Sequence, residues 1–163
     1  MSGRGAPKPE ASGTTDGTGL KVTIVAGRWH TEITNGLLAG ARRVLTASGA
    51  EVREVRVPGS FELALASKAA LEAGADAVVA LGVIIRGGTP HFEYISDATT
   101  RGLSDVALAS GKPVGFGVLT LDDEQQGLDR AGLPGSKEDK GAEAASAALE
   151  LANLLRELRS HHV

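Results

Sequence analysis

The sequence contains no cysteine among its 163 residues. This absence excludes a disulfide scaffold, a thiolate zinc site, an iron–sulfur cluster and a cysteine nucleophile, and it fits a reducing compartment. Aromatic residues are also scarce, at 3% of the chain, so each one can be considered individually.

The chain has no excess of positive charge, since 17 Lys and Arg face 20 Asp and Glu. This balance argues against a general nucleic-acid binder and against a polybasic membrane anchor. No apolar run approaches the roughly 18 residues of a spanning helix, and no signal-peptide pattern opens the chain. We therefore expect a cytoplasmic protein that binds neither nucleic acid nor membrane and holds any anionic ligand with a few local cations.

The length fits one domain, which we place at residues 20–159. Residues 1–19 are mostly Gly, Ser, Thr and Pro without an apolar period, so they cannot bury enough surface to offset their ordering entropy. We assign them to a disordered N-terminal tail outside the fold, and residues 160–163 to a C-terminal tail.

From residue 20 onward, short β-rich runs alternate with longer stretches of helical spacing. The predicted strands cover 21–26, 51–57, 77–85 and 114–119. The predicted helices cover Ile33 to Gly49, 61–73, 91–109, 123–130 and 139–159, the last with Leu151, Leu154, Leu155 and Leu158 on one face. Four strand-to-helix alternations specify an α/β fold with a parallel sheet covered on both sides, and the continuously apolar 77–85 belongs in its middle.

The residue types that carry chemistry follow the predicted strands. In open parallel sheets, ligands bind beyond the carboxyl ends of the strands. The loops there contain Gly27 to His30, Pro58 to Glu62, Arg86 to His91, and Thr120 with Phe116 just upstream.

The Gly87-Gly88-Thr89 turn could hold a phosphate with its backbone N–H groups at a helix N-terminus. A Gly-Gly pair after a strand is more often only a tight turn. His91 stands two residues beyond Thr89, within reach of a group bound there, and an imidazole can both accept and donate protons near neutral pH. It could also be a first-turn histidine without a chemical role.

Five further residues each have a structural and a functional interpretation. Trp29 could stack on a flat heterocycle or cover the start of the following helix, and Phe116 could be a core residue. Glu62 suits the first turn of a helix whether or not it binds anything. Arg130 could satisfy terminal carbonyls of the short helix, and Lys140 could be a solvated charge.

Several blocks resemble the 6,7-dimethyl-8-ribityllumazine synthase family of riboflavin biosynthesis. They are IVAGRWHTEITNGLLAGA, PGSFEL, LGVIIRGGTPHFEYI, FGVLT, and LDRAG followed by EDKGAEAA, in the family's order over most of residues 20–158. The resemblance implies a flavodoxin-like three-layer α/β/α fold with a four-stranded parallel sheet. It also implies a transferase without cofactor or metal that condenses 5-amino-6-ribitylaminopyrimidinedione with 3,4-dihydroxy-2-butanone 4-phosphate and releases phosphate and water.

The resemblance also assigns roles to individual positions. His91 matches the proton-transfer histidine. Phosphate-binding positions match Gly88, Thr89, Arg130 and Lys140, and substrate-binding positions match Trp29, Ser60, Phe61, Glu62, Val83, Ile84, Ile85 and Phe116. Phe116 and Lys140 match residues that reach in from a neighbouring subunit. Glu93 stands where the family more often has Asp, and the longer acid could alter the orientation of His91.

The family forms pentamers, some of which assemble into decamers or sixty-subunit shells. The long Pro-containing link at 132–139 predicts an isolated pentamer or a pair of pentamers, because it would obstruct packing between pentamers. Riboflavin synthase, which uses the product, is a candidate partner. Two other functions stay open: an archaeal-type riboflavin synthase, and a non-catalytic lumazine- or flavin-binding shell protein.

Overall fold

The computed structural model describes residues 15–161, and its helices and strands follow the predicted alternation. The elements are β1 (Lys21–Gly27), α1 (Thr31–Ser48), β2 (Glu51–Val57), the 3-10 helix η1 (Ser60–Glu62), α2 (Leu63–Glu72), β3 (Ala77–Ile85), α3 (His91–Ser110), β4 (Val114–Leu121), α4 (Glu124–Leu128) and α5 (Lys140–Ser160). The predicted end of the first helix is confirmed, since Gly49 takes a left-handed φ of 83° and its N–H bonds the last carbonyls of α1.

Within the described residues, the sheet is four-stranded and all parallel, in the order β2-β1-β3-β4. This is the flavodoxin-like order, in which the chain reverses direction across the sheet between β1 and β3. The predicted central place of β3 is confirmed, because β3 lies between β1 and β4 and is buried along nearly its whole length.

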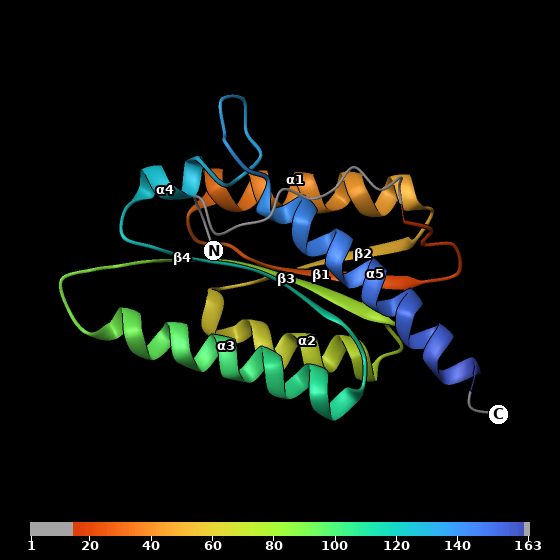
Figure 1. The fold of residues 1–163 in the computed structure, drawn as a ribbon. Coiled ribbons are helices and arrows are strands. Elements are labelled where there is room, and N and C mark those ends of the chain that lie inside the picture. The colour runs from red at the N-terminus through yellow and green to blue at the C-terminus, as the bar shows by residue number, and fades with distance from the viewer. Residues whose placement is uncertain (1–14, 162–163) are drawn as a thin grey trace.

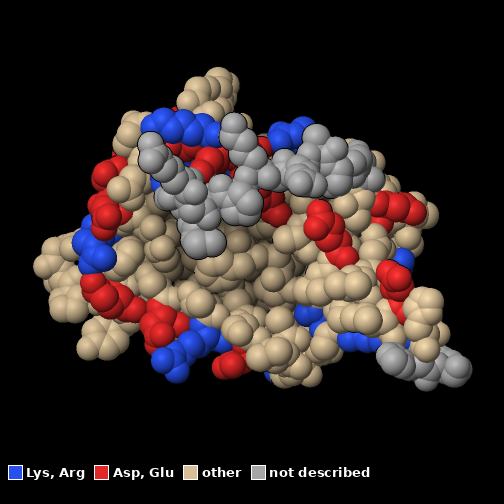
Figure 2. Space-filling view, viewed as in Figure 1, with Lys and Arg blue, Asp and Glu red and all other residues tan. Residues whose placement is uncertain are grey.

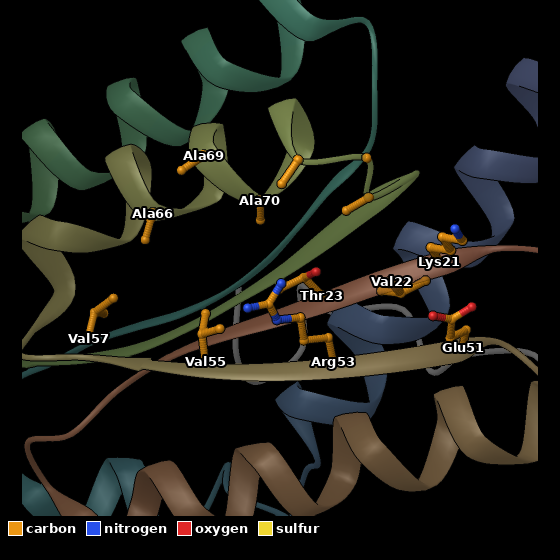
Figure 3. Close-up of a pocket in the computed structure, with 13 residues that line it drawn as sticks. Lys21, Val22, Thr23, Glu51, Arg53, Val55, Val57, Ala66, Ala69 and Ala70 are labelled. Carbon is orange, nitrogen blue, oxygen red and sulfur yellow. The ribbon is translucent and has the colours of Figure 1, made fainter.

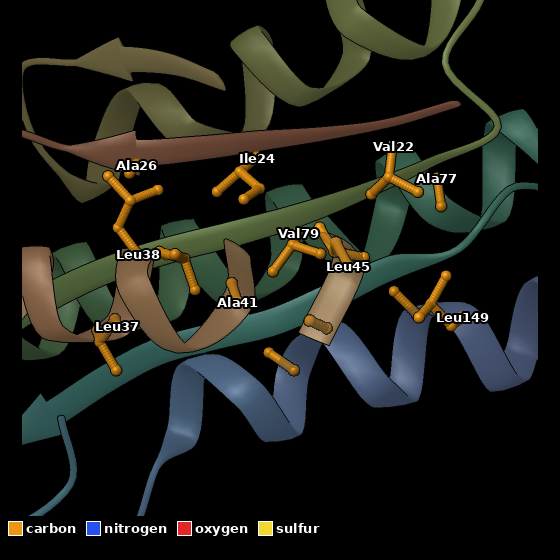
Figure 4. Close-up of a cluster of buried hydrophobic side chains, with 14 of the residues drawn as sticks. Val22, Ile24, Ala26, Leu37, Leu38, Ala41, Leu45, Ala77, Val79 and Leu149 are labelled. Atoms are coloured by element: carbon orange, nitrogen blue, oxygen red, sulfur yellow. The ribbon is translucent and has the colours of Figure 1, made fainter. Parts of the chain in front are cut away.

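Helices cover both faces of the sheet, with α1, α4 and α5 on one side and α2 and α3 on the other (Figure 1). Alternate side chains of β1 and β3 supply one hydrophobic core on each face. On the first face, Ile24 and Val79 pack with Leu37 and Leu45 of α1 and Leu149 of α5 (Figure 4). The sheet is therefore a rigid platform whose carboxyl edge carries the loops.

The helices α1 and α5 touch backbone to backbone at Gly141. A Cβ at this position would lie 1.9 Å from the Leu37 carbonyl oxygen, so only glycine permits this approach. The contact fixes where α5 begins, and with it the position of Lys140.

The structure corrects the predicted domain boundary. The backbone N–H of Gly17 donates to Ser48 at 2.8 Å, and the carbonyl of Asp16 accepts from Asn153 of α5 at 2.7 Å. Residues 15–19 thus belong to the folded domain, although they lack an apolar period. The remainder of the predicted tail, residues 1–14, and residues 162–163 lie outside the described residues.

Candidate active site

The predicted site residues gather where the strand order reverses. Trp29 follows β1, while Gly88 and His91 follow β3, so their loops flank the position where open α/β sheets bind ligands. The loop after β2 joins them, because Gly59 lies against Trp29 and Ser60 lies against Gly82 of β3.

Trp29 has 64% of its surface exposed, yet its indole packs against the backbone of Gly59. This packing position is called the seat of the indole below. A Cβ at Gly59 would lie 2.6 Å from Cζ3 of the indole, which shows that the six-membered ring rests on the backbone of Gly59. The indole therefore contacts the loop after β2. An exposed indole at the strand ends offers a π-face to a flat heterocycle.

The η1 residues line up beside this indole. Ser60 is buried with its hydroxyl 3.5 Å from the Val83 carbonyl, whereas the Phe61 side chain is exposed. The Glu62 carboxylate accepts the Gly59 N–H at 3.0 Å, so Glu62 holds the seat of Trp29 in addition to standing at a helix start.

The end of β3 contributes mainly backbone. Val83 and Ile84 are each only 7% exposed and belong to the cores on opposite faces of the sheet, while Ile85 is half-buried. A ligand at the strand end would therefore meet the backbone of Val83 and Ile84, and of these three side chains only that of Ile85.

The loop between β3 and α3 is open. Gly87 and Gly88 lie outside the left-handed region, and a Cβ at either would meet nothing within 4 Å. The described part of the chain therefore does not require glycine here, whereas a ligand that approaches the backbone closely would require it. Thr89 and His91 are exposed, and His91 begins the 20-residue helix α3, whose N-terminus favours an anion.

Arg86 braces this loop against the next strand end. Its Nε donates to Asp122 at 3.0 Å, another guanidinium nitrogen donates to Glu93, and the guanidinium lies 4.2 Å from the centre of the Phe92 ring. Glu93 thus pairs with Arg86, and no hydrogen bond among the described residues joins Glu93 to His91. The hydrogen bond from Arg86 lowers the pKa of Glu93 from its ordinary value.

Because the folded-state pKa of Glu93 is lowered, its carboxylate is ionised at every pH above the ordinary glutamate pKa. It becomes protonated only at a lower pH than an ordinary glutamate does. We therefore expect Glu93→Gln to leave the shape of the kcat/KM profile unchanged between about pH 5 and pH 8. The ion pair is half-exposed, so the substitution should change the free energy of unfolding little. A new inflection in this pH range would contradict the prediction, and urea unfolding measures the stability.

A second group of charges lies between α4 and α5. The Arg130 guanidinium donates to the Gln126 carbonyl at 2.7 Å, and its Nε lies 3.8 Å from Oε2 of Glu138. The Lys140 ammonium lies 3.4 Å from the same Glu138 oxygen and 2.7 Å from Glu143. The carbonyl-capping interpretation of Arg130 is confirmed, and the solvated interpretation of Lys140 is wrong because its side chain is only 18% exposed.

This group, Arg130, Glu138, Lys140 and Glu143, is called the Arg130–Lys140 cluster below. Burial lowers the pKa of Lys140, but the hydrogen bond and charge of Glu143 and the charge of Glu138 outweigh it, and the pKa lies above its ordinary value. Lys140 is therefore cationic at neutral pH. Arg130 has five N–H donors, of which the Gln126 carbonyl takes one, so the cluster has donors left for an anion.

Phe116 lies beside Lys140 and apart from Trp29. Phe116 and Lys140 line a groove of about 390 Å³ between β4 and α5. The Phe116 side chain is 48% exposed. The interpretation of Phe116 as a core residue is wrong, because β4 is an edge strand. Phe116 pairs in register with Ala80 in the middle of β3, so a single chain does not bring it to the strand ends.

This groove opens on a largely uncharged face. Figure 2 shows charged side chains around the margin of that face and uncharged atoms in its middle, over β4. Three leucines of α5, Leu151, Leu154 and Leu158, are between 43% and 49% exposed. These leucines of the predicted face are thus left partly exposed by the residues that the structure describes.

Sequence reasoning assigned no role to Arg86, Glu138 or Thr34. Arg86 could have been found as a charged residue directly after a buried strand, and Glu138 as an acid between two basic positions. Thr34, whose hydroxyl donates to the Trp29 carbonyl at 2.8 Å, gives no such signal, because threonine in an apolar helix face is ordinary.

A groove away from the strand-end loops holds none of the predicted site residues. It measures about 580 Å³ and runs between β2 and α2, where Val55, Ala66 and Ala70 face one another and Arg53 reaches across (Figure 3). Within residues 15–161, no group of three or more His, Asp or Glu side chains is placed to hold a metal ion. The strand-end loops therefore remain the candidate site.

None of the helices between residues 15 and 161 has the length and apolarity needed to cross a bilayer.

The family model for 6,7-dimethyl-8-ribityllumazine synthase matches residues 19–156. Relatives with that name include one from Leifsonia xyli subsp. xyli at 74% identity and one from Clavibacter michiganensis subsp. michiganensis at 69%, each aligned over 98% of this chain and 99% of the relative. Another, from Kineococcus radiotolerans, is 62% identical over 96% of this chain and 95% of the relative.

Proposed function

The chain belongs to the 6,7-dimethyl-8-ribityllumazine synthase family, and from that premise we propose how its residues carry out the family's reaction. The enzyme is a transferase of riboflavin biosynthesis. It condenses 5-amino-6-ribitylaminopyrimidinedione with 3,4-dihydroxy-2-butanone 4-phosphate to 6,7-dimethyl-8-ribityllumazine, and it releases inorganic phosphate and water.

The pyrimidine binds at the ends of β1 and β3, stacked on Trp29. The exposed indole seated on Gly59 is the single observation that carries this assignment, because a planar ring needs a planar partner held in place. Ser60, Phe61 and Glu62 lie beside it for the ribityl chain and ring, and the end of β3, Val83 to Ile85, offers its backbone to the heterocycle.

The phosphate of the second substrate binds at the start of α3. Gly88 and Thr89 provide backbone N–H groups at the positive end of the helix dipole. Arg130 and Lys140 supply the positive charge that a dianionic phosphate needs. The open space beside Gly88 supports this assignment, because a phosphate can approach the backbone there without meeting a side chain.

His91 transfers protons during the condensation. The amine of the pyrimidine attacks the ketone, one water leaves to give an imine, and phosphate is eliminated. The ribitylamino nitrogen then attacks the remaining carbonyl, and the ring closes with loss of a second water. Each step moves a proton, and the His91 imidazole stands on the first turn of the helix whose N-terminus receives the phosphate. Proximity of the two substrates supplies much of the remaining acceleration.

Each site is completed by a neighbouring copy of the chain. Phe116 lines a groove together with Lys140 and Glu143 of the Arg130–Lys140 cluster, on a face of β4 and α5 that the described residues leave uncovered. A copy that places this face against the Trp29 and His91 loops of the next forms a head-to-tail contact, and such contacts form a ring when the rotation between copies closes. We propose a pentamer of this kind.

The link at 132–139 limits further assembly to a pair of pentamers at most. It projects from the helix layer (Figure 1) and is held rigidly, since the Ser136 hydroxyl accepts from the Leu133 N–H at 2.9 Å and donates to the Leu128 carbonyl at 2.5 Å. A rigid projection cannot fold away to admit close packing between rings. A megadalton particle in sedimentation would contradict this assignment.

The phosphorylated substrate does not cross membranes, which supports a cytoplasmic location, and riboflavin synthase is the candidate partner that would take the product. Incubation with both substrates should produce the absorbance of the lumazine with stoichiometric phosphate release. The lumazine supplied alone should stay unchanged. Flavin from the lumazine alone would indicate a riboflavin synthase, and lumazine binding without turnover would indicate a carrier.

A further inference from the structure

The turn that carries Trp29 is strained and fixed at both ends. His30 has a φ of 54° and is the one non-glycine residue among 15–161 with a positive φ. Such conformations persist only where surrounding contacts hold them, and they cluster at functional sites. At the β1 side, the Arg28 N–H donates to Val57 at 2.9 Å and Arg56 donates to the Gly27 carbonyl at 3.0 Å.

Thr34 fixes the other end of the turn. Its hydroxyl donates to the Trp29 carbonyl at 2.8 Å, and its backbone N–H donates to the His30 carbonyl at 3.0 Å. Thr34 is fully buried on the first turns of α1. A rigid helix thus holds the backbone of Trp29 directly, while the indole itself remains exposed.

The seat of the indole is prepared independently. Gly59 leaves room for the six-membered ring, and the Glu62 carboxylate holds the Gly59 N–H. With its carbonyl held by Thr34 and its ring resting on Gly59, Trp29 has little freedom to move. An aromatic platform fixed before the ligand arrives loses less conformational entropy on binding.

We propose that Thr34 is a positioning residue for Trp29: its buried hydroxyl holds the strained turn so that the indole is already in place for the pyrimidine substrate. This inference rests on the proposed stacking of that substrate on Trp29. Thr34 itself does not touch the substrate, and it acts only through the backbone of Trp29.

The test replaces the Thr34 hydroxyl and follows the single tryptophan of the chain in the intact oligomer. Thr34→Val keeps the shape of the side chain but removes the donor. The free protein should then show lower Trp fluorescence anisotropy and stronger acrylamide quenching. The KM for the pyrimidine should rise about 3- to 10-fold, with kcat and the KM for the phosphorylated substrate unchanged.

Two variants make the result specific. Thr34→Ser keeps the hydroxyl and should restore both the anisotropy and the KM. Ser48→Ala removes another buried hydroxyl, which donates to the Leu45 carbonyl at the far end of α1, and should change neither. If circular dichroism shows that Thr34→Val does not fold, the same measurements are made on Thr34→Ala instead.

The outcomes separate the inference from the proposed function. Unchanged anisotropy and quenching in Thr34→Val overturn the positioning role. Altered fluorescence with an unchanged pyrimidine KM also overturns it as a device for substrate binding. The stacking itself is tested by quenching of Trp29 on addition of the pyrimidine to the wild-type protein, and absence of quenching counts against the proposed function.

Gly59→Ala tests the seat from the opposite side. The φ of Gly59 is −145°, which alanine adopts without strain, so the added methyl acts only by displacing the indole. The same fall in anisotropy and rise in pyrimidine KM are expected. Gly102→Ala is the control, because its methyl would lie 2.7 Å from Ala64 between α2 and α3, and an equal effect of both variants would contradict the seat.

Discussion

Replacement of His91 by alanine is expected to lower kcat by about 10²-fold, near the lower end of what general acid–base catalysis contributes. The side chain is exposed and makes no hydrogen bond within the described residues, so its loss should leave the fold and both KM values nearly unchanged. A fall in kcat and kcat/KM together marks an interaction made in the transition state. Residual activity should remain, because the variant still brings the two substrates together.

Steady-state kinetics with each substrate varied in turn measures this effect. His161→Ala is the matched control, since it removes an exposed histidine near the end of α5 and should behave as wild type. An unchanged kcat in His91→Ala would remove His91 from the mechanism.

Replacement of Arg130 by alanine should raise the KM for the phosphorylated substrate by about 10- to 100-fold, the effect of losing hydrogen bonds to a charged group. The KM for the pyrimidine should change little, and inhibition by free phosphate should weaken in parallel. Arg130→Lys should lie between alanine and wild type, because lysine keeps the charge but lacks the planar fork.

Arg130 also donates to the Gln126 carbonyl, so stability must be measured beside the kinetics. Arg101→Ala is the control, since Arg101 is an exposed cation paired with Asp97. Equal weakening of both substrates, together with a lower unfolding temperature, would indicate a structural role for Arg130.

The fold was predictable because local pattern and tertiary burial agree along most of the chain. The continuously apolar run of β3 is buried on both faces, and Gly49 ends α1 in the conformation that glycine favours. Residues 15–19 were missed because hydrogen bonds from α5 hold them, including one from Asn153 at a separation of 137 residues. A local apolar pattern cannot report such contacts.

The candidate site was predictable only in part, for a related reason. The positions of Trp29 and His91 follow from the alternation of strands and helices, which sends them to one edge of the sheet. The exposure of Phe116 depends on β4 being an edge strand, and that depends on strand order. The seat of Trp29 on Gly59 and the burial of Lys140 likewise require contacts between segments far apart in the chain.

The central claim is that each site combines His91 of one copy with the Arg130–Lys140 cluster of the next. It is tested most directly by mixing the two impaired variants, His91→Ala and Arg130→Ala, unfolded together and reassembled in equal amounts. Random mixing around a head-to-tail ring should give intact sites at about one quarter of the interfaces. At a phosphorylated-substrate concentration well below the wild-type KM, activity should therefore rise toward one quarter of wild type, above either variant alone. Activity that stays at the average of the two separate variants would show that both residues serve a site within one chain, and would contradict the account.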